Sequence, residues 1–196
     1  MDEHRRFLSA FDGLRDEACV PALRSLCLVF LEEFHHRKEE DLLFPVIAAD
    51  RRVHAGGPEC VLHFDMQMRS PPLETARSAC AAAGVPALEP PWPPGSQSLR
   101  EENSPLVIPL EDHEAGRVLL RGIDALPPGS EPVALRLLDA YRDLQARHFR
   151  KEDGCLFCMS RQLVDPGRWA EIERVEPQWT AAGLHPKAAR ALSATS

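Results

Sequence analysis

The decamer HHRKEEDLLF at residues 35–44 decides the fold prediction, because it returns as HFRKEDGCLF at residues 148–157. Six of the ten positions are identical, and the shared pattern is H-x-R-K-E-x-x-x-L-F. In both copies a glutamate follows the histidine by four residues, which places the two side chains one turn apart on the same face of a helix. Each copy therefore predicts a helix that directs one imidazole and one carboxylate towards the same point.

The flanking histidines repeat as well. His4 precedes His35 by 31 residues, and His113 precedes His148 by 35 residues. The chain thus reads as two helical hairpins, each with a histidine on its first helix and an HxxxE pattern on its second. We expect an all-α, up-down four-helix bundle with this repeat at its centre.

Apolar periodicity and proline positions set the expected boundaries. Helices are predicted over about 2–17, 21–49, 105–125 and 132–163. Residues 59–104 are expected to be an insertion between helices two and three, with short helices near 59–69 and 73–83 and an extended proline-rich loop over 85–104. The bundle domain would span residues 1–164, followed by a tail over 165–196 with one or two short helices around Trp169 and Lys187.

The composition limits the classes of binding partner and the cellular compartment that we expect. The net charge of −7 argues against nucleic acid or an anionic membrane surface. No apolar run is long enough to cross a bilayer, and the first residues lack a secretory pattern, so the cytoplasm is the expected location. The six cysteines should then be free thiols, with Cys155 and Cys158 as two thiols near a helix end rather than a redox couple.

Glu39 and Glu152 fall on the apolar seams that should face the bundle axis. A buried carboxylate is costly unless it is paired or binds a metal, and two of them beside four histidines create a need for cations. Imidazole and carboxylate ligands suit iron, manganese or zinc, and glutamates from two helices can bridge two metals. A solvated helix face would explain one HxxxE pattern, but four histidines at matched positions favour a metal site.

Three segments together resemble the hemerythrin-like (HHE cation-binding) family. They are HHRKEEDLLFP at 35–45, EDHEAGR at 111–117 and HFRKEDGCLF at 148–157, and the resemblance covers about residues 1–164 apart from the insertion. It implies a di-iron centre, or a pair of other divalent metals, with a histidine from each helix and bridging carboxylates from the second and fourth. The ligands it implies are His4, His35, Glu39, His113, His148 and Glu152.

The sequence departs from the oxygen-carrying members of that family. Those proteins carry a second histidine one turn from the third-helix histidine, whereas the positions four residues from His113 are Pro109 and Arg117. A further ligand would have to come from elsewhere, and the candidates are His36, His63 and Glu114.

His35 and His36 compete for one ligand position. His36 has Glu32 one turn before it and Glu40 one turn after it, so we expect it to face a polar flank. His35 is the preferred ligand, and replacing His36 with alanine is expected to leave the metal content intact.

The implied function is binding or sensing of a small ligand such as O2 or NO, or iron handling. A di-iron enzyme for peroxide or NO reduction, or for iron–sulfur repair, is the alternative, and a helical interaction module without catalysis is a third. The sequence leaves open whether the protein is an enzyme, and whether it acts with a protein partner or as a homodimer. Tyr141, two turns before His148, could hydrogen-bond to a metal-bound ligand or simply pack, and Cys155 could lie at the edge of the site.

Overall fold

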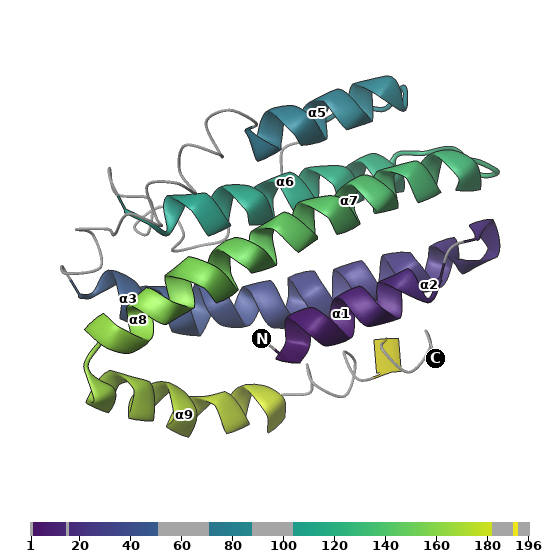
Figure 1. The fold of residues 1–196 in the computed structure, drawn as a ribbon. Helices are drawn as coiled ribbons and strands as arrows, with labels where there is room; N and C mark the ends of the chain where they lie inside the picture. The colour runs from purple at the N-terminus through teal and green to yellow at the C-terminus, as the bar shows by residue number, and fades with distance from the viewer. Residues whose placement is uncertain (1, 15, 51–70, 88–103, 182–189, 192–196) are drawn as a thin grey trace.

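A computed structural model describes residues 2–14, 16–50, 71–87, 104–181 and 190–191, and within these ranges the chain is helical and contains no strand. The all-α prediction is confirmed at that level. The second helical run is continuous in Figure 1 and comprises η1 (Glu17–Cys19), α2 (Val20–Ser25), η2 (Leu26–His36), η3 (Glu39–Leu43) and α3 (Phe44–Ala48). The other elements are α1 (Asp2–Asp12), α5 (Pro72–Ala82), α6 (Val107–Asp124), α7 (Glu131–Lys151), η6 (Glu152–Leu156), α8 (Phe157–Leu163) and α9 (Pro166–Ala181).

Helix α1 is amphipathic and packs against both η2 and α7. Its buried residues are His4, Phe7 and Phe11, which recur at three- and four-residue spacing and so share one face. Acidic residues occupy its first turn, where the helix dipole favours them. The apolar stripe of α1 thereby carries His4 into the interior.

The two copies of the HxxxE pattern lie where the helices widen. The segments η2, η3 and η6 are π-helical, and they contain or begin at His35, Glu39 and Glu152. A π-helical turn holds more residues than an α-helical turn, and such segments occur often at functional sites. In a wider turn consecutive side chains are rotated less relative to each other, which helps adjacent residues to face the same region.

Helix α5 belongs to the apolar core, although its residues fall in the segment predicted as an insertion. It confirms the helix predicted near 73–83, and its buried Ala76 and Cys80 pack with the core against α6. Gly122 permits this contact, because a Cβ there would lie 2.7 Å from the sulfur of Cys80. The helix predicted near 59–69 and most of the proline-rich loop lie outside the described residues.

Two apolar clusters are separated by polar side chains. The larger cluster includes Phe7, Tyr141 and Phe149, and the smaller one includes Phe44 and Leu110. The tail helix α9 confirms the helix predicted around Trp169, while Lys187 lies outside the described residues. Among the helices that the structure describes, none combines the length and apolar character that crossing a bilayer requires.

Candidate metal centre

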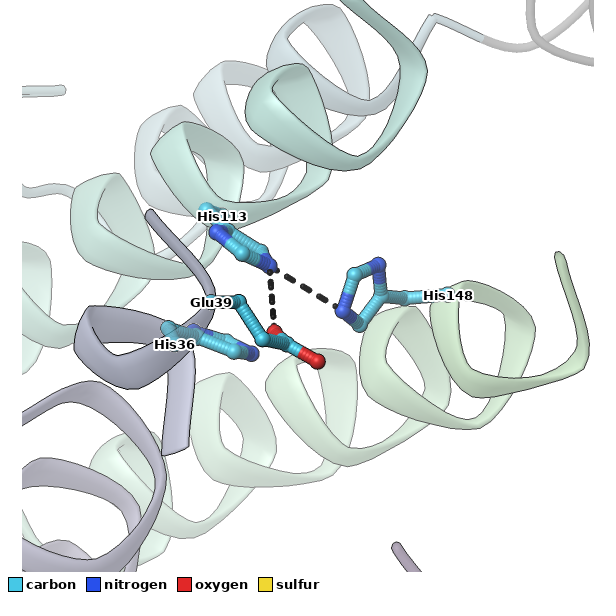
Figure 2. Close-up of side chains that lie close together, drawn as sticks. All are labelled: His36, Glu39, His113 and His148. Atoms are coloured by element: carbon cyan, nitrogen blue, oxygen red, sulfur yellow. Dashed lines mark hydrogen bonds and ion pairs between the residues drawn. The ribbon is translucent and has the colours of Figure 1, made fainter. Parts of the chain in front are cut away.

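Two groups of buried side chains, which share Glu39, each bring four possible ligand atoms within 4.8 Å of one another. The three-histidine group consists of His36, Glu39, His113 and His148 (Figure 2). The two-histidine group consists of His4, His35, Glu39 and Glu152. The structure therefore brings all six ligands implied by the resemblance together and adds His36.

The carboxylates lie between the two groups. Glu39 Oε2 is 3.5 Å from His113 Nε2, and Glu39 Oε1 is 3.4 Å from His35 Nε2. Glu152 Oε2 is 3.5 Å from His4 Nε2 and 3.3 Å from His148 Nε2. Each glutamate thus reaches both groups, as a bridging ligand must.

The imidazoles turn the same ring nitrogen inward. The Nε2 atoms of His4 and His35 are 2.9 Å apart, and those of His113 and His148 are 3.2 Å apart. Ligand atoms that surround one ion at about 2.1 Å lie roughly 3–4 Å from each other. The observed spacing is therefore that of ligand atoms around a common centre.

Several inward atoms have no hydrogen-bond partner among the described residues. They are Glu39 Oε2, both carboxylate oxygens of Glu152 and His36 Nε2. Burial raises the pKa of Glu39 and Glu152 well above the usual range, and for Glu152 the charge of Glu39 adds to this. Burial also holds the pKa of His113 well below its usual value. A cation would reverse this cost, because it favours ionised carboxylates and neutral imidazoles together.

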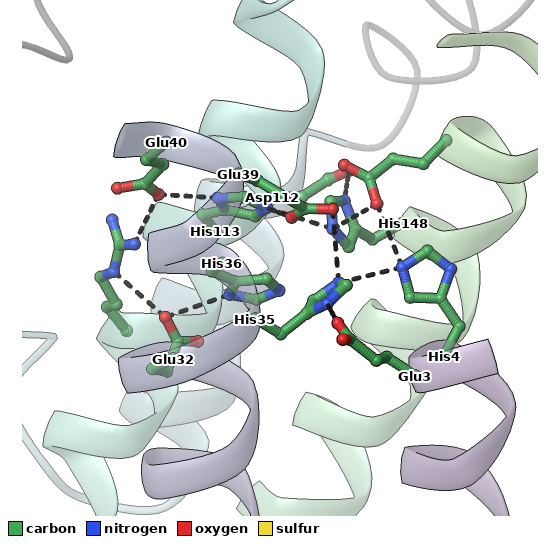
Figure 3. Close-up of polar contacts among 12 residues, drawn as sticks. Glu3, His4, Glu32, His35, His36, Glu39, Glu40, Asp112, His113 and His148 are labelled. Atoms are coloured by element: carbon green, nitrogen blue, oxygen red, sulfur yellow. Dashed lines mark hydrogen bonds and ion pairs between the residues drawn. The ribbon is translucent and has the colours of Figure 1, made fainter. Parts of the chain in front are cut away.

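An outer ring of carboxylates faces the opposite nitrogen of each histidine, and Figure 3 shows Glu3, Glu32, Glu40 and Asp112 of this ring. The Nδ1–carboxylate distances are 3.0 Å for His4–Asp153, 2.7 Å for His35–Glu3, 3.2 Å for His36–Glu32, 2.7 Å for His113–Glu40 and 3.4 Å for His148–Asp112. Such partners favour the tautomer with the proton on Nδ1 and keep the Nε2 lone pair available to a metal.

The sequence repeat extends into this outer ring. Glu40 and Asp153 occupy the same position of the decamer, while Glu3 and Asp112 directly precede His4 and His113. The lysines repeat too: Lys38 Nζ is 2.7 Å from Glu3, and Lys151 pairs with Asp112. The two halves of the site therefore use equivalent residues for equivalent contacts.

One position breaks the symmetry. His36 of the first decamer corresponds to Phe149 of the second. The His36 ring stacks on His113 with centroids 3.8 Å apart, and the Phe149 ring stacks on His4 with centroids 4.0 Å apart. The same packing position thus supplies a third imidazole to one half and an apolar ring to the other.

The position predicted for His36 was wrong. Instead of lying on a polar flank outside the site, it is fully buried and belongs to the three-histidine group. The overlooked signal is its position three residues before Glu39, because residues i and i+3 also share a helix face. Glu114 is buried but lies outside both groups, and His63 lies outside the described residues.

Tyr141 reaches the site through Glu32. Its hydroxyl donates to Glu32 Oε1 at 2.7 Å, and Arg117 Nε donates to Glu32 Oε2 at 3.1 Å. Burial opposes ionisation of Glu32, but His36, Arg117 and Tyr141 together lower its pKa to about 2. Tyr141 therefore positions the carboxylate that contacts His36 and does not itself enter either ligand group.

The cysteines of the second decamer region are free thiols, as predicted. Cys158 is exposed and its thiol donates to the carbonyl of Asp153. Cys155 is buried and shares the wall of a small cavity, about 20 Å³, with Glu152 and Pro109. Cys155 thus lies at the edge of the site.

Comparisons of this chain with protein-family models, with curated proteins and with solved structures found no match. Buried histidines and glutamates in this arrangement are compatible with metal binding.

Proposed function

We propose that this chain is a hemerythrin-like protein that holds two metal ions, and that the metal is iron. In this proposal α1, the run from α2 to α3, α6, and the run from α7 to α8 form an up-down four-helix bundle over residues 1–164. Helix α5 packs against α6 and α7, and α9 belongs to the tail over residues 165–196.

The observation that carries the proposal is the position of Glu39. Its two oxygens face different histidine groups, at 3.4 Å from His35 Nε2 and 3.5 Å from His113 Nε2. A carboxylate so placed suits two cations better than one, and Glu152 lies similarly between His4 and His148. Glutamates and histidines from several helices of a bundle are a common ligand set for di-iron centres.

The residues of this chain would have distinct roles at the metal centre. Five imidazoles would supply neutral donors, the outer carboxylates would hold their orientation, and Phe149 and Phe44 would exclude water beside His4 and His113. The two-histidine half provides fewer protein ligands and thus leaves more room for an external ligand. A di-iron centre supplies, when bound, an exchangeable position for O2, NO or peroxide.

We favour ligand binding or sensing as the function. The three-histidine group has no exposed imidazole, since His36, His113 and His148 are all 0% exposed. Small, weakly polar ligands such as O2 and NO can enter a site of this kind, whereas large substrates cannot approach that half directly.

The test is anaerobic loading with ferrous iron, followed by exposure to air and then to azide. We expect about two irons per chain, near-ultraviolet absorption bands of an oxygen-bridged ferric pair, and a shift of those bands by azide. Iron that binds without these bands, or bands that azide leaves unchanged, would contradict an open di-iron site. Turnover of peroxide or NO by the loaded protein would move the function to the enzyme class.

A further inference from the structure

A cavity of about 310 Å³ lies beside the two-histidine group, between α1, η2–η3, α8 and α9. His35 and Glu39 form part of its wall. This volume is at the lower end of the range for small-molecule sites. It is far larger than O2 or NO requires.

Of the ten other residues in the wall, five are apolar and five are charged. Leu42 and Leu43 come from η3, Phe157 from α8, and Trp169 and Ile172 from α9. Aromatic and aliphatic walls with a few polar groups are typical of sites for organic ligands. These five side chains suit the hydrophobic or aromatic part of a ligand.

The charged groups of the wall are paired with one exception. Lys38 Nζ contacts Glu3 at 2.7 Å and Glu176 at 3.4 Å, and Asp2 contacts Arg5 at 3.6 Å. Arg161 forms no ion pair within the part of the chain that the structure describes. A guanidinium in that position is suited to a carboxylate, which it can bind through two parallel hydrogen bonds.

A second polar group also lacks a partner. The indole nitrogen Nε1 of Trp169 is buried and has no hydrogen-bond acceptor among the described residues. An indole N–H can only donate, and leaving it unpaired when buried is unfavourable. Trp169 lines the cavity, but its Nε1 atom has no accessible surface, so this residue offers a ligand its apolar ring rather than a hydrogen-bond donor.

We propose that this cavity binds a small aromatic carboxylic acid, with its ring against Phe157, Trp169 and Ile172 and its carboxylate at Arg161. The acid would be a co-substrate or effector of the metal centre. The position of the acid beside a metal rests on the proposed function, whereas its binding to the cavity does not. Helix α9, from the predicted tail, is then one wall of the site.

The test is calorimetric titration of the full-length protein, metal-free and iron-loaded, with 1-naphthoate and with its neutral amide. We expect saturable binding of 1-naphthoate with one site per chain, and weaker binding of the amide. Arg161→Gln should weaken naphthoate roughly tenfold and the amide little, because only the acid uses the ionic contact. Trp169→Ala, which removes the ring from the cavity wall, should weaken both ligands severalfold.

Arg168→Gln is the matched control, because Arg168 is an exposed arginine as Arg161 is, but lies on α9 and does not line the cavity. It should bind naphthoate as the wild type does. Absence of saturable naphthoate binding, or binding that Arg161→Gln and Trp169→Ala leave unchanged, would overturn the proposal. Naphthoate binding to a protein that takes up no metal would support the cavity and contradict the proposed function. Uptake of two irons without naphthoate binding would support the proposed function and contradict the proposed ligand of the cavity.

Discussion

The two halves of the site are built from the same repeated pattern, yet they differ in one residue that decides their character. The three-histidine half places His36 where the two-histidine half places Phe149, and each ring stacks on the first-helix histidine of the other hairpin, His36 on His113 and Phe149 on His4. The halves differ also in access. His113 and His148 are fully enclosed, whereas His35 lines the cavity under α9.

The two halves also differ in the residues that surround the ligand groups. Glu32, which contacts His36, lies four residues before it, and Gln145 lies four residues before Phe149. The side-chain nitrogen and oxygen of Gln145 are buried and have no hydrogen-bond partner among the described residues. Arg117, which donates to Glu32, corresponds to Leu8 on α1. The additional imidazole, His36, is therefore accompanied by the carboxylate of Glu32 and the guanidinium of Arg117. The two halves therefore share a repeated ligand pattern and differ in a few positions around it.

The largest expected effect comes from the residue that both halves share. Glu39→Ala should reduce metal content from two ions to at most one per chain, because each group loses a ligand. Metal analysis after desalting measures this. Glu33→Gln on the exposed face of the same helical run is the control and should retain the wild-type content. Retention of two ions by Glu39→Ala would contradict the assignment of Glu39 as a bridging ligand.

Making the halves alike should weaken one metal selectively. His36→Phe copies the Phe149 position and should lower the affinity for one ion by at least about a hundredfold, more than the roughly 10–100-fold typical of outer partners. The second ion should remain. Competition with a chromophoric chelator separates the two affinities. Unchanged affinities would show that His36 is not a ligand, as the sequence analysis expected.

The metal-free protein should lose stability in both pH directions. Burial, opposed by the contact with Glu3, lowers the pKa of His35 to about 4, so the unfolded state binds more protons and stability falls as the pH drops from about 6.5 to 4. The effect of this residue is on the order of 3 kcal/mol. The pKa of Glu39 is raised by burial, so stability also falls as the pH rises above about 4.5 towards the folded-state value.

Urea denaturation between pH 4 and pH 9 measures both arms of this curve. Glu39→Gln should flatten the alkaline arm of the metal-free protein, because the amide does not ionise. Metal loading should flatten it in the wild type, because the cation stabilises the carboxylates. An alkaline arm that neither change affects would show that the buried glutamates are not its cause.

Removing an outer carboxylate should have a smaller effect that depends on the half. Glu3→Gln should weaken the metal on the two-histidine side, and Asp112→Asn the metal on the three-histidine side, each by roughly 10–100-fold. Both variants keep the shape of the side chain and remove its charge. The chelator competition should show opposite selectivity for the two variants. Equal weakening of both ions by either variant would contradict the division into halves.

The smallest expected effect concerns packing on the two sides. A Cβ at Gly116 would lie 2.9 Å from Gln145 Nε2 and 3.0 Å from Tyr141 Cε2, so Gly116→Ala should destabilise the fold by about 1–3 kcal/mol. Gly154 in η6 has no neighbour within 4 Å of such a Cβ, so Gly154→Ala should stabilise the fold by up to about 1 kcal/mol. Thermal denaturation compares the pair, and equal effects would argue against the tight packing beside Glu32.

The sequence predicted most of this arrangement because periodicity and repetition are local properties. The HxxxE pairs and their matched histidines predicted which helices converge and which six side chains meet. It did not predict that α5 packs into the core, because a short small-residue helix after a glycine-rich break carries no long-range signal. His36 was misplaced because its acidic neighbours suggested solvent, whereas in the structure Glu32 contacts its ring and Glu40 supports His113.

The outer carboxylates and the cavity depend on contacts between distant segments. Glu3 meets His35 across 32 residues, and Asp153 meets His4 across 149 residues. Helix α9 reaches Lys38 through Glu176. No spacing rule along one helix reports such pairs, so only the folded chain shows them.

The most direct test of the central claim is the number of metal ions per chain in the wild-type protein, purified without chelator and then loaded anaerobically with ferrous iron. Inductively coupled plasma mass spectrometry on a protein sample of known concentration gives this number. We expect two irons per chain in the wild-type protein and at most one in Glu39→Ala. One iron or none in the loaded wild-type protein would contradict a two-metal centre bridged by Glu39.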